Sequence, residues 1–507
     1  MIYLRLDGHQ YQYEVEDILK LFFMDEKIIL VSEDSFDLSE GVFIRSSLVK
    51  REAGGNIVFE LNSSVKGIDG LTYESTLDIT QIIEEISDTH KAKRAVKRVI
   101  KRQVYKILVQ YTKKEMPWGV LTGIRPAKIV HEMLDNRHDK EYILEELKNN
   151  YFLSEHKAHV LYNVALSEKK ILDSTKSDMV SIYIGIPFCP TRCLYCSFTS
   201  NPIKKYEKMV ESYMAALAKE IKSVDKMLKD RMLKIQSIYI GGGTPTSIDA
   251  QYLEMLLKEI ESTFCLDFVR EFTLEAGRPD SITLKKLEVI ANSKVNRISI
   301  NPQTMKDETL LRIGRSHTSL DIIEAFKLAR GLGFDNINMD VIAGLPGEKL
   351  EDFLYTLHEI EKLFPESITV HTMSIKRASR LKDERNNYKL TDASEVAKMV
   401  NAAYEFIRGM GLLPYYLYRQ KNILGNLENI GYARPGTESI YNVQIMEERQ
   451  TIFALGAGAI TKIVYPKENR IERVFNVKSI EDYISRIDEM IRRKEEIMHT
   501  NIQKVKS

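Results

Sequence analysis

Hydrophobic positions between about residues 180 and 410 follow two alternating spacings. Short apolar runs predict buried strands at 181–187, 235–240, 271–275, 296–300, 336–342 and 367–375. Between them, apolar residues recur three and four positions apart, which predicts helices over 204–230, 250–264, 283–293, 318–332, 349–363 and 392–410. Six strand–helix units in succession predict an α/β fold, a partial (β/α)6 TIM-like barrel. Active sites of such folds lie at the C-terminal ends of the strands.

The first 80 residues have a β-rich pattern. Residues 2–6 and 11–15 alternate in polarity and flank Asp7-Gly8, which predicts a hairpin, and further strands are expected near 28–31, 41–44 and 56–61. The spacing becomes helical after about residue 80. Residues 91–106 combine many Lys and Arg with an apolar stripe. Such a helix suits RNA, a membrane face or an anionic partner, but the balanced total charge favours a solvated face over a buried stripe.

These patterns divide the chain into four regions. We expect a β-rich N-terminal region (1–80), a helical basic region (81–174), the barrel (175–410) and a mainly helical C-terminal cap domain (411–507). The first two together form an α+β extension. Trp118, the only tryptophan, lies in a turn-rich joint of the second region and is expected to be a packing anchor.

Composition narrows the class of protein. The 507 residues are 44% hydrophobic and 29% charged, which is ordinary for a globular protein. A net charge of +1 gives no overall pull toward nucleic acid or a membrane, and we do not expect nucleic acid as a partner. No apolar run approaches the roughly 20 residues of a membrane span. Three of the four cysteines are clustered, which indicates a reducing compartment, so we expect a cytoplasmic protein.

The clustered cysteines are Cys189, Cys193 and Cys196, on a predicted loop that leaves the first barrel strand. Three thiolates on one loop can share one soft inorganic centre but cannot all form disulfides. Their spacing differs from that of a zinc ribbon and of a four-cysteine ferredoxin. A structural zinc site or three unrelated thiols are the alternatives. Zinc needs a fourth ligand, and the remaining Cys265 is expected to be a small buried hydrophobe.

At this point the residues resemble the radical S-adenosylmethionine (SAM) superfamily. In that superfamily three cysteines hold a [4Fe–4S] cluster, and the open iron binds the amine and carboxylate of SAM. Reduction then yields a 5′-deoxyadenosyl radical.

Further polar residues follow the other predicted barrel strands. Gly241-Gly-Gly-Thr-Pro-Thr246 follows the second strand and allows close backbone approach, and Glu275 ends the third, where it can accept hydrogen bonds from ribose hydroxyls. The fourth and fifth strands bring Gln303, Arg315 and Asp340, for which surface polarity or a structural hydrogen bond is the alternative. After the sixth strand come Lys376, Arg377, Arg380, Lys382, Arg385 and Lys389. These cations suit a substrate with several carboxylates, or else form a solvated loop.

The order of these motifs resembles the oxygen-independent coproporphyrinogen III oxidase family over about residues 178–465. The N-terminal extension, with Arg419-Gln-Lys-Asn422 and Gly425-Asn-Leu-Glu-Asn429, resembles its HemZ-type branch. The resemblance implies that Cys189, Cys193 and Cys196 hold the cluster. It also implies one or two bound SAM molecules, with contacts from Tyr183, Tyr195, Gly242, Gly243, Thr244, Glu275, Gln303, Arg315, Asp340, Met373 and Ile460.

The activity implied is oxidative decarboxylation of two propionates of coproporphyrinogen III, giving protoporphyrinogen IX in haem biosynthesis. Its implied partners are the tetrapyrrole substrate and an electron donor of the flavodoxin or ferredoxin type. Phe198 stands where the oxidase type has a further cysteine, and it resembles the haem-chaperone branch of the same family. The alternative is therefore a haem-binding transfer protein, with His317 or His371 as candidate iron ligands.

Overall fold

The computed structural model describes residues 1–24, 26–32, 41–53, 56–84, 89–198, 200–376, 379–383, 388, 390–420, 423–468 and 470–505. The chain forms two compact units. The first comprises Met1–Pro126 and Glu132–Tyr162, and the second comprises Ala127–His131 and Asn163–Ser507. Within the described residues, every helix is too short or too polar to cross a lipid bilayer.

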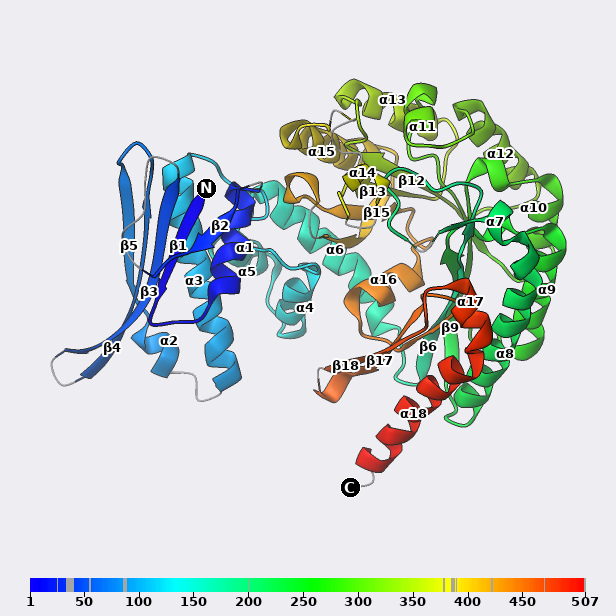
Figure 1. The fold of residues 1–507 in the computed structure, drawn as a ribbon, viewed down its shortest axis with the longest axis horizontal. Coiled ribbons are helices and arrows are strands. Elements are labelled where there is room, and N and C mark those ends of the chain that lie inside the picture. Colours follow the sequence, from blue (N-terminus) through cyan, green and yellow to red (C-terminus); the bar gives the residue numbers. More distant parts are fainter. Residues whose placement is uncertain are drawn as a thin grey trace. The chain divides into compact units, whose positions relative to one another are not determined.

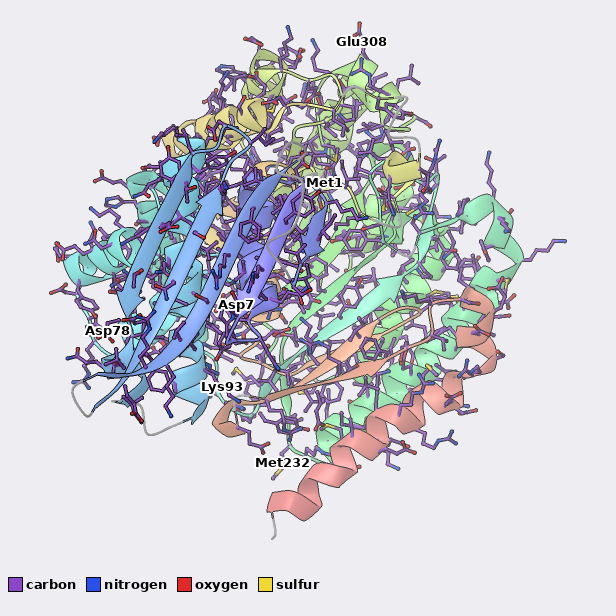
Figure 2. All side chains as sticks on the ribbon, turned by 60° about the vertical axis from the view of Figure 1, so that its left-hand side comes forward. Met1, Asp7, Asp78, Lys93, Met232 and Glu308 are labelled. Carbon is purple, nitrogen blue, oxygen red and sulfur yellow. The ribbon has the colours of Figure 1, made fainter. Side chains whose placement is uncertain are left out.

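A five-stranded sheet forms the centre of the first unit. Its strands are β1 (Ile2–Asp7), β2 (Ile28–Leu30), β3 (Val42–Ala53), β4 (Asn56–Lys66) and β5 (Thr72–Asp78), in the order β2-β1-β3-β4-β5. Strand β1 is parallel to both neighbours, whereas β3, β4 and β5 form an antiparallel meander. Figure 2 shows this sheet face-on, with Met1 and Asp7 at the two ends of β1.

The predicted hairpin around Asp7-Gly8 is wrong. Residues 11–15 do not form a strand; they open helix α1 (Gln12–Phe22), which carries the chain across to β2. Val15, Ile18 and Leu19 are fully buried, at the three- and four-residue spacing of one helix face. Two polar–apolar alternations at the start of such a helix look like a strand, and only the following turns separate the two structures.

The remaining helices of this region are α2 (Thr80–Glu84), α3 (Thr89–Thr112), α4 (Ala127–Asp135), α5 (Lys140–Asn149) and α6 (Glu155–Asp173). The basic helix α3 buries its predicted apolar stripe, which includes Ile100 and Leu108. Two of its cations pair with α1: Lys97 Nζ lies 2.5 Å from Glu14 Oε1, and Lys101 Nζ lies 3.2 Å from Asp17 Oδ2. Trp118 is 1% exposed, as its predicted packing role requires.

The second unit contains the predicted barrel. Its six parallel strands are neighbours in chain order: β6 (Met179–Ile186), β9 (Lys234–Gly242), β10 (Glu271–Gly277), β11 (Arg297–Ile300), β12 (Ile337–Ala343) and β13 (Ser367–Thr372). The helices that follow them are α8 (Val210–Lys229), α9 (Ala250–Thr263), α10 (Leu284–Ala291), α12 (Ser319–Gly331), α13 (Leu350–Glu361) and α15 (Ala393–Gly409). Figure 1 shows these helices curving around the outside of the strands. The predicted partial (β/α)6 fold is confirmed.

Short elements occupy the barrel loops: β7 (Phe188–Cys189), β8 (Asn201–Pro202), α7 (Ile203–Tyr206), α11 (Asp307–Arg312) and α14 (Arg380–Asp383).

The C-terminal segment extends the barrel sheet at both edges. Strand β15 (Asn429–Ala433) pairs with β13 and with β14 (Leu413–Tyr418), and β16 (Ile452–Leu455) pairs with β6 and leads to β17 (Ile460–Tyr465) and β18 (Arg470–Phe475). Three helices accompany them: α16 (Ile440–Glu447), α17 (Ile480–Ser485) and α18 (Ile487–Val505). The segment is therefore mixed rather than mainly helical. An incomplete barrel leaves two strand edges with unpaired backbone groups, and these strands cover them.

Candidate active site

The cysteine loop begins where β6 ends. Cys189 lies in β7, and the backbone N–H of Cys196 donates to the Cys193 carbonyl at 3.2 Å, which tightens the loop. Cys189 and Cys193 are buried, and Cys196 is half-buried. Cys189 Sγ lies 3.6 Å from Thr244 Oγ1, and Arg278 Nη1 donates to Cys193 Sγ at 3.6 Å. Each of these two sulfurs therefore has a polar neighbour from another barrel strand end.

The glycine run after β9 packs directly against this loop. A Cβ on Gly243 would lie 2.4 Å from the Phe188 carbonyl oxygen and 3.0 Å from Cys189 Sγ. Gly242 has a φ of +114°, a backbone conformation that other residues rarely adopt. Both glycines are required for the cysteine loop to approach the end of β9. The close backbone contact expected at this position is thus made to the loop itself.

One cavity at the C-terminal ends of the strands collects most of the predicted site residues. It contains about 1130 Å³ of space between atoms, part of it open to solvent. Predicted residues that line it are Cys189, Cys193, Tyr195, Cys196, Gly242, Gly243, Thr244, Glu275, Gln303, Arg315, Asp340 and Met373.

Tyr183 and Ile460 do not line this cavity. Tyr183 stacks with Tyr239 and Tyr441 at ring-centroid distances of 6.4 and 6.1 Å, and those two rings are 4.5 Å apart. Burial raises the pKa of Tyr183, and the nearby Glu275 adds to the shift. Ile460 begins β17 and is 39% exposed. The structure places neither side chain with the cysteines.

Glu275 presents a carboxylate with spare acceptor capacity. The Tyr239 hydroxyl donates to its Oε1 at 2.5 Å, and the side chain is only half-buried because it faces the cavity. Burial raises the pKa of Glu275 to about 7; Asp340 adds to the rise, while Tyr239 and Arg297 oppose it. A ligand with hydroxyl or amine donors fits this position.

Asp340 belongs to a chain of polar contacts that reaches from β12 to β14. Its Oδ1 accepts from Asn338 Nδ2 at 2.7 Å, and its Oδ2 lies 3.6 Å from His371 Nε2. His371 Nδ1 lies 3.1 Å from the Tyr418 hydroxyl on β14. Although burial opposes it, His371 lowers the pKa of Asp340, so this carboxylate is held charged. Asp340 therefore has a structural hydrogen bond and still faces the cavity.

Arg315 and Gln303 are held by backbone contacts. Arg315 Nη1 donates to the Asn301 carbonyl at 2.5 Å, and Nη2 donates to the Tyr195 hydroxyl at 3.2 Å. Gln303 has a φ of +68° and bridges to Val341 on β12. Both side chains are buried, so simple surface polarity does not account for them.

Arg278 is a site residue that sequence reasoning missed. Its Nη2 pairs with Asp280 Oδ2 at 2.6 Å, while Nη1 donates to Thr191 and to Cys193. Although burial opposes it, Asp280 and Cys193 raise the pKa of Arg278. The signal was its position directly after β10, two residues beyond the end of the apolar run. Asn301, Gln420 and Asn429 also line the cavity without having been predicted.

The predicted cationic rim is only partly built. Lys376 lines the cavity with its Nζ 5.5 Å from the centre of the Phe198 ring, and burial lowers its pKa. Arg380 and Lys382 are exposed on α14 and do not line it. Arg377, Arg385 and Lys389 lie outside the described residues. One described cation of the predicted set therefore faces the cavity.

The two candidate histidines differ. His371 lines the cavity, whereas His317 does not. The Nδ1 atom of His317 lies 3.5 Å from Asp280 Oδ1, and burial lowers the pKa of His317.

Cys265 departs from its expected role as a small buried hydrophobe. It is exposed, because Phe264 takes the buried position after α9, and its Sγ lies 3.6 Å from Asp267 Oδ2.

The cysteine loop fits an iron–sulfur cluster better than a single zinc ion. Four ligands around zinc with bonds of about 2.3 Å bring sulfur atoms within roughly 4 Å of one another. In the described part of the chain, one set of three Cys, His or acidic residues has its ligand atoms within 4.8 Å of one another. The three cysteines are not part of that set, so their sulfur atoms are spread more widely than this limit. Their wider spread suits a multi-iron centre.

Comparison with known proteins defines the class. Residues 183–360 match the radical SAM superfamily, and the fold and the cysteine loop just described lie within that span or next to it. The chain is therefore a radical SAM protein, and this membership implies a [4Fe–4S] cluster and SAM.

A narrower family is also shown. The chain is 44% identical over 402 residues to the oxygen-independent coproporphyrinogen-III oxidase-like protein HemZ of Bacillus subtilis, covering 78% of this chain and 80% of that protein. It belongs to this HemZ-type family. It is 30% identical over 284 residues to the heme chaperone HemW of the same organism, covering 55% and 70% of the two chains. The structure of coproporphyrinogen III oxidase HemN from Escherichia coli aligns with a TM-score of 0.49 at 21% identity, covering 64% and 73%.

Proposed function

We propose that this chain carries out the oxygen-independent oxidative decarboxylation of coproporphyrinogen III to protoporphyrinogen IX in the cytoplasm. The observation that carries the proposal is the composition of the cavity. The same cavity is lined by the three cysteines and part of the glycine run, and by His371, Lys376 and Tyr418. This one space therefore holds both soft thiol ligands for a cofactor and a cation and hydrogen-bonding groups for a second, anionic molecule.

For the cofactors, Cys189, Cys193 and Cys196 would hold the cluster and leave one iron for SAM. The backbone after β9, Glu275, Gln303, Arg315 and Asp340 would hold one or two SAM molecules. When bound, the cluster and SAM supply the radical chemistry that removes hydrogen from the β-carbon of a propionate, after which CO₂ and one electron leave.

For the substrate, we assign Lys376 as the cation that pairs with a propionate carboxylate. Its partial burial strengthens such a pair, because the surrounding dielectric is lower than that of water. The exposed Phe198 ring beside it offers a flat apolar surface to a pyrrole. A donor of the flavodoxin or ferredoxin type would supply the electron that starts each turnover.

The test is anaerobic incubation of the cluster-reconstituted protein with SAM, a reductant and coproporphyrinogen III. Protoporphyrinogen IX and methionine should accumulate together, and Lys376→Met should raise the KM for substrate while SAM binding is unchanged. Cleavage of SAM without decarboxylation would contradict the proposal.

The second candidate function is haem binding and transfer. Phe198 and the similarity to HemW motivate it, and His371 is the candidate iron ligand because its ring reaches the cavity. Haem titration distinguishes the two functions. Stoichiometric uptake that His371→Ala abolishes, and that the exposed-histidine control His358→Ala retains, would favour transfer, particularly if no substrate turnover occurs. Absence of haem binding at micromolar protein would end this candidate.

A further inference from the structure

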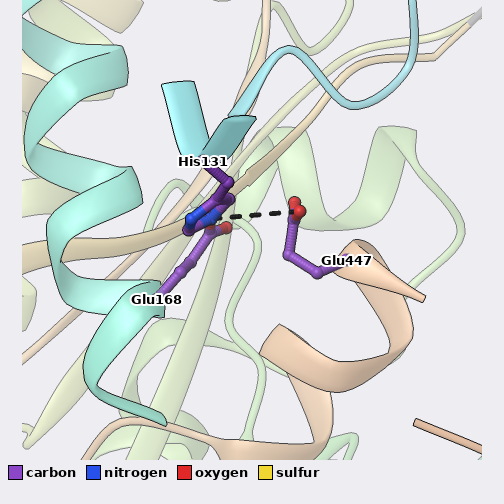
Figure 3. Close-up of side chains that lie close together, drawn as sticks. All are labelled: His131, Glu168 and Glu447. Atoms are coloured by element: carbon purple, nitrogen blue, oxygen red, sulfur yellow. Dashed lines mark hydrogen bonds and ion pairs between the residues drawn. The ribbon is translucent and has the colours of Figure 1, made fainter. Parts of the chain in front are cut away.

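Three buried metal-ligating side chains converge away from the active-site cavity. His131 lies on α4, Glu168 on α6 and Glu447 at the end of α16, and none of them lines that cavity. Their side chains are 1% exposed or less. Figure 3 shows the two carboxylates reaching the His131 ring from different sides. These residues are far apart in sequence, and only the fold of the second unit brings them together.

The distances are those of a ligand set. His131 Nε2 lies 2.8 Å from Glu168 Oε2 and 3.9 Å from Glu447 Oε2. One ligand atom from each of the three residues lies within 4.8 Å of the other two. Tetrahedral zinc with bonds of about 2.0–2.1 Å places its ligand atoms roughly 3.3 Å apart. The observed separations bracket that value, so small side-chain shifts are enough to admit an ion.

A hydrogen bond between His131 and Glu168 does not explain why Glu447 lies beside them. The Nε2–H group of His131 can donate to one carboxylate, and Glu447 Oε2 lies 3.9 Å from His131 Nε2, which is beyond hydrogen-bond distance. Glu168 Oε1 is fully buried and makes no hydrogen bond among the described residues, although buried carboxylate oxygens normally have partners. Two buried carboxylates thus approach one imidazole ring.

We propose that His131, Glu168 and Glu447 bind one divalent transition-metal ion of the zinc class, separate from the iron–sulfur cluster. One imidazole with two carboxylates is a donor set that zinc accepts, whereas Mg²⁺ and Ca²⁺ prefer oxygen ligands alone. A dication neutralises the two carboxylates with the imidazole neutral. Glu168 Oε1 can complete the coordination as the second oxygen of a bidentate carboxylate. Because the site is closed to solvent, the ion is structural and joins the start of α4 to α6 and α16.

The experiment uses the full-length, cluster-loaded protein, stripped of other metals with a chelator and titrated anaerobically with Zn²⁺ against a chromogenic competitor. We expect one zinc equivalent per chain, bound without displacing iron. The same stoichiometry is expected in a variant with all four cysteines replaced by serine, which removes every thiol ligand. Excess Mg²⁺ should not displace the ion.

Variants locate the site. Glu168→Gln with Glu447→Gln should weaken zinc binding by more than about 100-fold, because loss of a direct ligand exceeds the effect of losing a supporting contact. The matched control is His358→Ala with Glu361→Gln, an exposed His–Glu pair 3.5 Å apart, which should bind zinc as the unmodified protein does.

If the ligand variants do not fold, X-ray absorption at the zinc edge of the unmodified protein still identifies the atoms that bind the ion. In the unmodified protein it should show nitrogen and oxygen ligands without sulfur. Less than stoichiometric zinc in the cysteine-free protein, or a sulfur-ligated ion in the unmodified one, would overturn the proposal.

Discussion

Glu220 and Glu275 are carboxylates of the same unit with opposite surroundings. Glu220 on α8 is fully buried and accepts hydrogen bonds from Gly456, Asn476, Tyr483 and Lys494 at 2.5–2.9 Å. Among the residues that the structure describes, Glu275 on β10 accepts a hydrogen bond from Tyr239 alone, and it faces the cavity. A saturated carboxylate beside a buried cation fixes the elements around it, whereas one with free acceptor capacity at a cavity is available to a ligand. The number of hydrogen bonds that each carboxylate accepts thus distinguishes Glu220, which stabilises the fold, from Glu275, which can bind a ligand.

The largest effect is expected at the saturated carboxylate. Lys494→Met would leave Glu220 buried without its cation, and removing one partner of a buried pair typically costs about 3–5 kcal/mol. We expect the free energy of unfolding, from urea titration followed by circular dichroism, to fall by that amount.

The matched control for Lys494→Met is Asp488→Asn. Asp488 also lies on α18 and pairs with α8 through Lys219, but both side chains are exposed. Surface pairs of this kind contribute less than about 1 kcal/mol. Equal losses in the two variants would show that burial does not set the contribution of the Glu220 network.

A smaller effect, on binding rather than stability, is expected at the open carboxylate. Glu275→Gln keeps the shape of the side chain but removes its charge, so stability should change by less than about 1 kcal/mol. Hydrogen bonds to charged groups are worth about 1.5–3 kcal/mol, so SAM affinity should fall by roughly 10- to 100-fold. Equilibrium dialysis with the cluster-loaded protein measures it. Unchanged SAM affinity would remove Glu275 from the binding site.

The smallest effect concerns pH. The pKa of Glu275 is raised to about 7 from 4.5, so the folded state keeps this proton at pH values where the unfolded state has lost it. The stabilising contribution of the protonated group is therefore lost as pH rises from about 4.5 through 7. SAM affinity should increase by up to about tenfold from pH 6 to pH 8, because the carboxylate is the better acceptor. An identical pH profile in Glu275→Gln would contradict this assignment.

The barrel could be predicted from sequence because its signals are local. Each strand is a short apolar run and each following helix has its own buried stripe, so the six units could be placed within a few residues. The hairpin around Gly8 failed because alternation over five residues does not separate a strand from the first turns of α1. Strand β15 pairs with β13, and β16 pairs with β6, across long separations in sequence. A local sequence pattern does not predict pairings of this kind.

The site residues also differ in whether a local sequence signal could identify them. Cys189, Glu275 and Asp340 were predictable because they lie at or near the C-terminal ends of parallel strands, and the fold brings those ends to one place. Gln420 and Asn429 were missed because they reach the cavity through the antiparallel β14–β15 pair. His131, Glu168 and Glu447 belong to no motif, since their spacing in sequence carries no information until the helices are packed.

The most direct measurement of the central claim, a three-cysteine cluster with one iron open for SAM, is the anaerobic iron and sulfide content of single serine variants. Cys193→Ser, Cys189→Ser and Cys196→Ser should each lose the cluster and its visible absorption. Cys265→Ser should retain about four irons and four sulfides per chain, because Cys265 is exposed and does not line the cavity. Loss of the cluster in Cys265→Ser as complete as in Cys193→Ser would contradict the account.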